Sequence, residues 1–256
     1  MVTAHEYLKG ILSKYKLDEG EVERLMNIRR EVEKSLMYRY GSHIEKILYS
    51  GSYAKKTAIS LKYDLDLCVM FKRSAFRTLD SMYLDVGDFL KRSFARYRPV
   101  GQRVSWGMTL ADGRGLDIVP ARSFEDGTDD ANLYVSNDDT SIKTNIKKHI
   151  EYISESSVRP IIKLMKVWKF RNKVDIKSFT LELATIEALR TNKGNDYADM
   201  VRTTLRFLAN EFDTTRLVDP ANSNNVVSNS MSDWEKQKVK VAAAASLNGG
   251  WEQAIW

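Results

Sequence analysis

The chain has 256 residues, of which 43% are hydrophobic, so it can bury one large core or the cores of two packed lobes. Lysine and arginine outnumber aspartate and glutamate by 40 to 34, and the resulting charge of +6 suits polyphosphate or nucleic-acid binding without requiring it. With a single cysteine, Cys68, the chain can form neither an internal disulfide nor a thiolate-rich zinc site. Neither a membrane span nor a signal peptide is recognisable in the sequence. We therefore expect a cytoplasmic protein.

The first half of the chain carries helix and strand patterns in alternation. Apolar side chains recur at helical spacing over residues 18–40, with Asp18 as an N-cap and Gly41 as a stop, which predicts a long helix. Strands and a further helix are expected downstream. The strands cover residues 44–49, 63–71, 103–110 and 115–119, the last two joined through Asp112 and Gly113, and the helix covers residues 76–98.

The second half is predicted to be helical, because strand patterns disappear after residue 145. Its helical patterns cover residues 145–156, 158–172, 178–191, 196–211 and 231–247. We therefore expect an α+β chain with a mixed lobe over residues 1–140 and a helical lobe over residues 141–256. The long N-terminal helix is expected to pack on both lobes.

Two aspartates stand two residues apart in the strand predicted over residues 63–71. Side chains alternate along a strand, so Asp64 and Asp66 project to the same side while Leu65 points into the core. Two neighbouring carboxylates repel one another unless a cation joins them. Magnesium, or manganese in its place, suits such oxygen ligands and is typically shared with substrate phosphates.

A third carboxylate is available downstream. Asp117 stands between apolar residues on its own short strand, where an unpaired charge is costly to bury. If that strand lies beside the first, Asp64, Asp66 and Asp117 meet as metal ligands and catalytic residues for two-metal phosphoryl transfer. Upstream, Gly51 lets the backbone approach a phosphate, and Ser52 offers its hydroxyl and backbone N–H groups to the same phosphates.

These residues resemble a known family. The segment GSYAKKTAISLKYDLDLCV, followed at a distance by LDIVP, is similar to the DNA polymerase β nucleotidyltransferase superfamily, marked by a glycine-serine turn, an acid-x-acid strand and a later third acid. Within it, the chain most resembles the CD-NTases (cGAS/DncV-like nucleotidyltransferases), relatives of cyclic GMP-AMP synthase and oligoadenylate synthase. Later motifs follow in the same order: KTNIKKHIEYI, PIIKLMKVWKF, IKSFTLELATIEAL, LVDPANSNNVV and WEQAIW.

The resemblance implies a polymerase β-like catalytic lobe with a mixed β-sheet and a helical nucleotide-binding lobe, with nucleoside triphosphates bound between them. By matching position, Lys166 and Ser178 would contact the triphosphate and Phe179 would stack on a base. The implied product is a cyclic di- or trinucleotide, or a short oligonucleotide, that acts as a second messenger in anti-phage signalling. The implied partners are a separate effector protein and a nucleic-acid activator or substrate.

The chain also departs from the family pattern. Lys56 stands where the family often has glycine, Ile146 stands where it often has proline, and the cysteine-histidine zinc insertion of the vertebrate DNA sensor is missing. DNA-length sensing of that kind is therefore not expected.

Three other functions remain open from the sequence. An enzyme that extends an RNA 3′ end or modifies tRNA, as CCA-adding enzymes do, would depend on added RNA and give a linear product. An enzyme that modifies a small cationic molecule such as an aminoglycoside would need an acidic acceptor pocket. A non-catalytic nucleic-acid-binding scaffold would not need the three aspartates.

Overall fold

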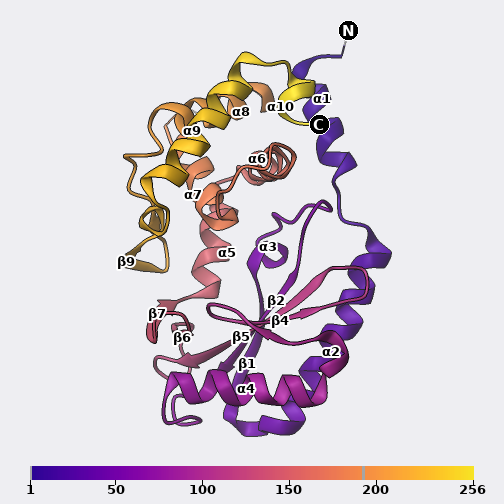
Figure 1. The fold of residues 1–256 in the computed structure, drawn as a ribbon, viewed down its shortest axis with the longest axis vertical. Helices are drawn as coiled ribbons and strands as arrows, with labels where there is room; N and C mark the ends of the chain where they lie inside the picture. Colours follow the sequence, from indigo (N-terminus) through magenta and orange to yellow (C-terminus); the bar gives the residue numbers. More distant parts are fainter. Residues whose placement is uncertain (1, 192–193) are drawn as a thin grey trace. The chain divides into compact units, whose positions relative to one another are not determined.

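The computed structural model describes residues 2–191 and 194–256, and the chain divides into two compact units (Figure 1). The sheet unit comprises Leu17–Ala58 and Lys62–Ile150. The helical unit comprises the chain up to Lys16, the segment Ile59–Leu61 and the residues from Glu151 onward. Each unit has its own buried apolar core.

The sheet unit is built on a mixed β-sheet. Its strands are β1 (Ile44–Ser50), β2 (Leu65–Phe71), β3 (Val100–Gly101), β4 (Trp106–Thr109), β5 (Gly115–Ser123), β6 (Ala131–Val135) and β7 (Thr140–Thr144). The order is β1-β2-β5-β4-β3, and β6 pairs with both β5 and β7. Strands β2 and β5 are parallel, whereas the other pairs in this sheet are antiparallel. The α+β class with a mixed sheet is thus confirmed.

Two helices pack on one face of this sheet (Figure 1). The expected long helix is α2 (Glu19–Tyr40), with Asp18 as its N-cap, and α4 (Leu79–Ser93) lies within the helix expected over residues 76–98. The Asp18 carboxylate accepts a hydrogen bond from the Glu21 backbone N–H at 2.8 Å. Buried side chains from both helices meet the residues of β2 that point to this face. They are Leu25, Val32, Leu36, Met82, Val86 and Leu90 from the helices and Leu65, Leu67, Val69 and Phe71 from β2.

The residues of β2 that alternate with these leucines point to the other face. Cys68 and Met70 pack there against Ala121 and Leu133, so this strand is buried on both sides. Burial raises the pKa of the Cys68 thiol to about 12, which leaves the single cysteine protonated and unreactive at neutral pH.

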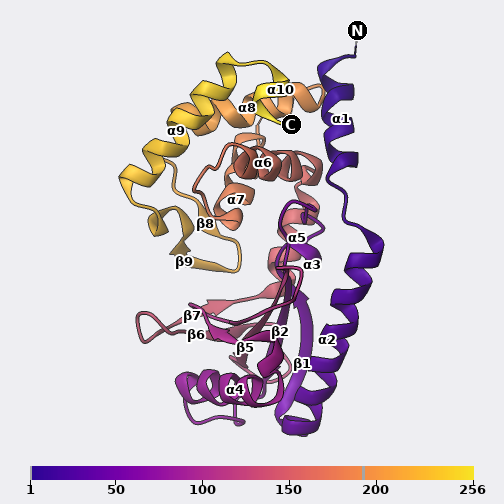
Figure 2. The ribbon, with the colours of Figure 1, turned by 45° about the vertical axis from the view of Figure 1, so that its right-hand side comes forward.

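The helical unit contains helices from both ends of the chain (Figure 2). They are α1 (Ala4–Lys14), α6 (Arg159–Arg171), α7 (Ser178–Ala188), α8 (Tyr197–Asn210), α9 (Asp233–Asn248) and the short α10 (Trp251–Ala254), while α5 (Ile146–Glu155) begins in the sheet unit and ends here. The side chain of Trp168 is fully buried in their core, and its indole N–H donates to the Ser246 hydroxyl at 2.8 Å. Within the part of the chain that the structure describes, no helix is long and apolar enough to cross a membrane.

The structure also contains elements that the sequence patterns did not predict. Helix α1 begins with a capping box between Thr3 and Glu6, and β6 and β7 form a hairpin. The expectation of no strand after residue 145 was wrong, because β8 (Val218–Asp219) and β9 (Asn222–Val226) pair in the helical unit. Strand β9 is mostly asparagine and serine, so it carries no apolar alternation that would reveal it.

Candidate active site

Two of the three predicted acids lie side by side in the sheet. The parallel register of β2 and β5 sets Asp66 opposite Asp117, and Asp64 directly precedes the first residue of β2. Residues in register on neighbouring strands point to the same face, so the Asp66 and Asp117 carboxyl groups share the face opposite helices α2 and α4. The condition that these two strands lie side by side is thus met.

Asp117 sits in an unfavourable electrostatic position. Burial, and then the negative charge of Asp64, raise the pKa of the Asp117 carboxyl to about 6, and the Gln102 side-chain N–H opposes this by donating to Asp117 Oδ1 at 3.3 Å. Asp64 is itself held in place, because its Oδ1 accepts a hydrogen bond from the Gly115 backbone N–H at 2.8 Å. The carboxylates of Asp64 and Asp117 are therefore close enough to interact.

Gly51 brings the preceding turn against these acids. Strand β1 is antiparallel to β2 with Ser50 opposite Asp66, and the short helix α3 (Gly51–Ala54) follows at once. Gly51 has φ +60°, and a Cβ on it would lie 1.7 Å from Asp66 Oδ2. The glycine is thus required by its backbone conformation and by the Asp66 carboxylate packed on it. Ser52 stands in the first turn of α3 and is half-buried.

Replacing Gly51 by alanine is expected to destabilise the chain more than the same change at Gly113, which also has a positive φ but open space around its missing side chain. Both variants carry the cost of a left-handed alanine, about 1 kcal/mol. Only Gly51→Ala must also displace Asp66, which adds roughly 1–3 kcal/mol. Urea unfolding of the two variants measures the difference, and equal losses would show that Asp66 does not pack on Gly51.

Gln102 was not identified from the sequence. The Ser105 hydroxyl donates to Gln102 Oε1 at 2.8 Å, which orients the amide so that its N–H group faces Asp117. Gly107 makes room for it, because a Cβ there would lie 2.2 Å from the Gln102 side-chain nitrogen. The sequence holds no signal for this contact, since Gln102 and Asp117 are 15 residues apart and meet only through the register of β3, β4 and β5.

The remaining predicted site residues belong to the helical unit. Lys166 lies in α6 and forms a buried ion pair with Glu182 of α7, with 2.7 Å between Nζ and Oε1 and side chains that are 4% and 1% exposed. Ser178 is the first residue of α7, and its hydroxyl accepts a hydrogen bond from the Lys169 ammonium group at 3.4 Å. Phe179 follows and packs partly on the core of this unit. The roles of Lys166, Ser178 and Phe179 toward a nucleotide stay predictions.

The acids fit a divalent cation chemically. In the part of the chain that the structure describes, no three carboxylate, imidazole or thiol groups are arranged closely enough to form a ready metal site. Burial, and then the charge of Asp64, raise the pKa of the Asp117 carboxyl, and a cation bound beside it would favour its charged form. Metal binding by Asp64, Asp66 and Asp117 together stays a prediction.

Comparison with solved structures identifies the fold. CdnC from E. coli MS115-1 with ATP is 18% identical, with a TM-score of 0.79, 97% of this chain covered and 91% of that one. The CD-NTase CdnG from Bradyrhizobium diazoefficiens in complex with GTP is 15% identical, with a TM-score of 0.79 and coverages of 97% and 91%. Vibrio cholerae DncV cyclic AMP-GMP synthase is 16% identical, with a TM-score of 0.65 and coverages of 82% and 66%. No protein-family model and no curated protein sequence matches the chain.

The chain combines a mixed sheet, with acids on two adjacent strands, and a unit of helices. The chain has the fold of the CD-NTases, because these neighbours cover nearly all of it. The resemblance noted in the sequence motifs is thereby confirmed at the level of the fold.

Proposed function

We propose that the protein is a metal-dependent, template-independent nucleotidyltransferase that joins nucleoside triphosphates and releases pyrophosphate. The observation that carries the proposal is the meeting of Asp66 with Asp117 across β2 and β5, with Asp64 beside them and the Gly51 turn packed on Asp66. Bound ATP and GTP in two of the similar structures support nucleotides as the substrates.

The chemistry assigned to the chain's own residues is limited to binding and proton transfer. Asp64, Asp66 and Asp117 hold Mg²⁺ or Mn²⁺, which when bound supplies positive charge to the triphosphate and to the attacking oxygen. We assign to Asp117 the acceptance of the proton of the attacking ribose hydroxyl. Its Oδ1 is engaged by Gln102, so we assign proton acceptance to Oδ2. Gly51 and Ser52 approach the phosphates from the turn after β1.

The proposed product is a cyclic di- or trinucleotide, or a short oligonucleotide, that serves as a second messenger. The names of two similar proteins support this choice: CdnE of Elizabethkingia meningoseptica is described as a cyclic dinucleotide synthase and DncV as a cyclic AMP-GMP synthase. We extend the proposal to a separate effector protein that responds to the product, to a nucleic-acid activator, and to anti-phage signalling in the cytoplasm, where nucleoside triphosphates are available.

Incubation with the four α-phosphate-labelled nucleoside triphosphates and Mg²⁺ or Mn²⁺ tests the activity. We expect label in a phosphatase-resistant product whose mass, measured by mass spectrometry, equals that of a cyclic or short linear oligonucleotide. A linear product formed only when RNA is added would indicate an RNA-end nucleotidyltransferase instead. Absence of any product with either metal and with added DNA, RNA or candidate protein activators would contradict the proposal.

Replacing Gln102 by leucine is expected to slow transfer without unfolding the chain. The substitution keeps a similar volume but removes the N–H group that orients Asp117, so kcat should fall about 10-fold, the cost of one hydrogen bond to a charged group. Steady-state kinetics measures this, with Gln237→Leu on helix α9 as the control. An unchanged kcat in Gln102→Leu would show that Asp117 does not need this contact.

A further inference from the structure

A pocket of about 250 Å³ opens on the surface of the helical unit, and none of the residues assigned to the chemistry lines it. It is formed where α8 and α10 approach the end of α9, three helices that lie together in both views (Figures 1 and 2). Two arginines, a tryptophan and a glycine pair line it. The lining residues are Arg202, Leu205 and Arg206 from α8, Ser246 and Leu247 from α9, and Gly249, Gly250 and Trp251 after it.

Two arginines give the lining of the pocket a positive charge. Arg202 and Arg206 are four residues apart on α8, so their side chains lie on the same face of the helix, where both are exposed to solvent. Among residues 2–191 and 194–256, neither pairs with a carboxylate. The guanidinium of Arg202 instead lies 5.2 Å from the Trp251 ring centroid. Two adjacent cations are complementary to an anion, and the only carboxylate recorded against the lining of the pocket in the described chain is that of Glu252, beside Gly250.

A structural role at the end of α9 is the competing explanation. Arginines near the last turn of a helix stabilise its unpaired carbonyl groups by donating hydrogen bonds to them. Within the described part of the chain, neither Arg202 nor Arg206 donates a hydrogen bond to a carbonyl of α9. The guanidinium N–H groups are therefore available to a ligand.

We propose that this pocket binds a nucleoside phosphate, with the phosphate on Arg202 and Arg206 and the base against Trp251 and the leucines. The planar guanidinium groups match phosphate oxygens, and an aromatic face accepts any base. A volume of about 250 Å³ is slightly below the roughly 300 Å³ at which ligand pockets begin, so the proposed ligand is a single nucleotide rather than an oligonucleotide. The inference does not depend on the proposed activity, because it concerns binding by helices α8, α9 and α10 alone.

The test is a calorimetric titration of the full chain with ADP in EDTA at low salt. Without a divalent cation the three aspartates of the sheet unit repel a phosphate, which disfavours binding at the proposed active site, and the arginine variants then report on the pocket. We expect Arg202→Ala and Arg206→Ala each to weaken ADP binding about 10-fold or more, as for loss of a hydrogen bond to a charged group. The indole N–H signal of Trp251, assigned from Trp251→Phe, should shift in the NMR spectrum as ADP is added.

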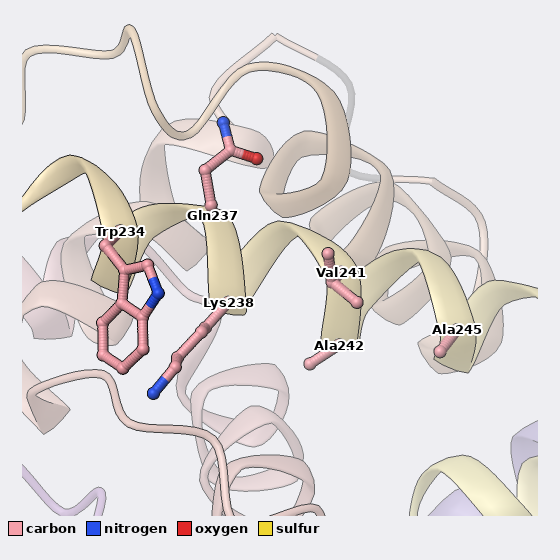
Figure 3. A pocket seen from close by; sticks show the side chains of 6 residues that line it. All are labelled: Trp234, Gln237, Lys238, Val241, Ala242 and Ala245. Atoms are coloured by element: carbon pink, nitrogen blue, oxygen red, sulfur yellow. The ribbon is translucent and has the colours of Figure 1, made fainter.

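Helix α9 offers a matched control in the same unit. The Lys238 ammonium group lies 3.1 Å from the ring centroid of exposed Trp234, at a shallow hollow of about 340 Å³ (Figure 3). That hollow has a cation beside a tryptophan but no second cation, and its lining comes from one helix only. Lys238→Ala should leave ADP binding unchanged. The proposal is overturned if the wild-type chain does not bind ADP, or if Lys238→Ala weakens binding as much as the arginine variants do.

Discussion

Replacing Asp117 by asparagine is expected to slow nucleotide transfer strongly while raising the stability of the metal-free chain at neutral pH. The amide keeps the shape of the carboxyl group but cannot accept the proton of the attacking hydroxyl, so kcat should fall about 10²- to 10⁴-fold. Asp64→Asn and Asp66→Asn should reduce activity by a comparable factor, since each removes a proposed metal ligand. Pyrophosphate release with Mg²⁺ measures the loss.

The gain in stability follows from the sign of the pKa shift. Folding raises the pKa of Asp117 from 3.8 to about 6, so between these two values the folded chain holds a proton that the unfolded chain has lost. The contribution of this group to stability therefore falls as pH rises through that window, and above it the charged carboxylate costs roughly 2–3 kcal/mol. Asp117→Asn removes this cost.

Urea unfolding in EDTA at pH 4 and pH 7 separates the two consequences. The stability difference between Asp117→Asn and wild type should be larger at pH 7, and added Mg²⁺ should stabilise the wild type more than the variant. Asp88→Asn, at an exposed position of α4, is the control and should change neither activity nor stability. A stability difference that is the same at both pH values would contradict the electrostatic position assigned to Asp117.

Replacing Lys166 by methionine is expected to destabilise the chain by about 3–5 kcal/mol. The substitution leaves Glu182, whose side chain is 1% exposed, as a buried charge without the ammonium group that pairs with it. For a chain of this length, that loss corresponds to a fall in Tm of roughly 6–20 °C. Calorimetry measures it, and Lys163→Met, the same substitution one turn earlier on α6, should cost much less because Lys163 is only half-buried.

A double variant separates the structural role of Lys166 from the predicted contact with triphosphate. Lys166→Met combined with Glu182→Leu removes both charges and should recover most of the lost stability. Its KM for nucleoside triphosphates then reports on the ammonium group alone. Stability that remains as low as in Lys166→Met would contradict the assignment of the loss to the unpaired buried charge of Glu182.

The three acidic residues were easier to predict from the sequence than the residues that contact them. Strand alternation placed the acids: Asp66 projects from β2 while Leu65 and Leu67 fill the core. Asp18 likewise predicted where α2 begins. Strand alternation and helix capping are both local signals, which is why the sequence alone reveals them. Helix α1 carries a comparable local signal in the capping box of Thr3 and Glu6, although no helix was predicted there.

The contacts that set the properties of the site are not local. Strand register makes Asp66 and Asp117 neighbours, and the bend of the chain after β1 packs Gly51 on Asp66. The pairing of Lys166 with Glu182 depends on how α6 meets α7, which helical periodicity does not specify. Gln102 reaches Asp117 only through the β3–β4 turn. Periodicity predicts the elements and their faces, whereas these partners depend on tertiary packing.

The central claim is that Asp64, Asp66 and Asp117 jointly hold divalent cations against a bound triphosphate. A crystal structure with Mn²⁺ and a non-hydrolysable nucleoside triphosphate tests it most directly, because anomalous scattering identifies manganese and distinguishes it from water. We predict manganese peaks within bonding distance, about 2.0–2.3 Å, of carboxylate oxygens of all three aspartates and of the phosphates. Manganese bound elsewhere, or a triphosphate that approaches none of the three carboxylates, would contradict the claim.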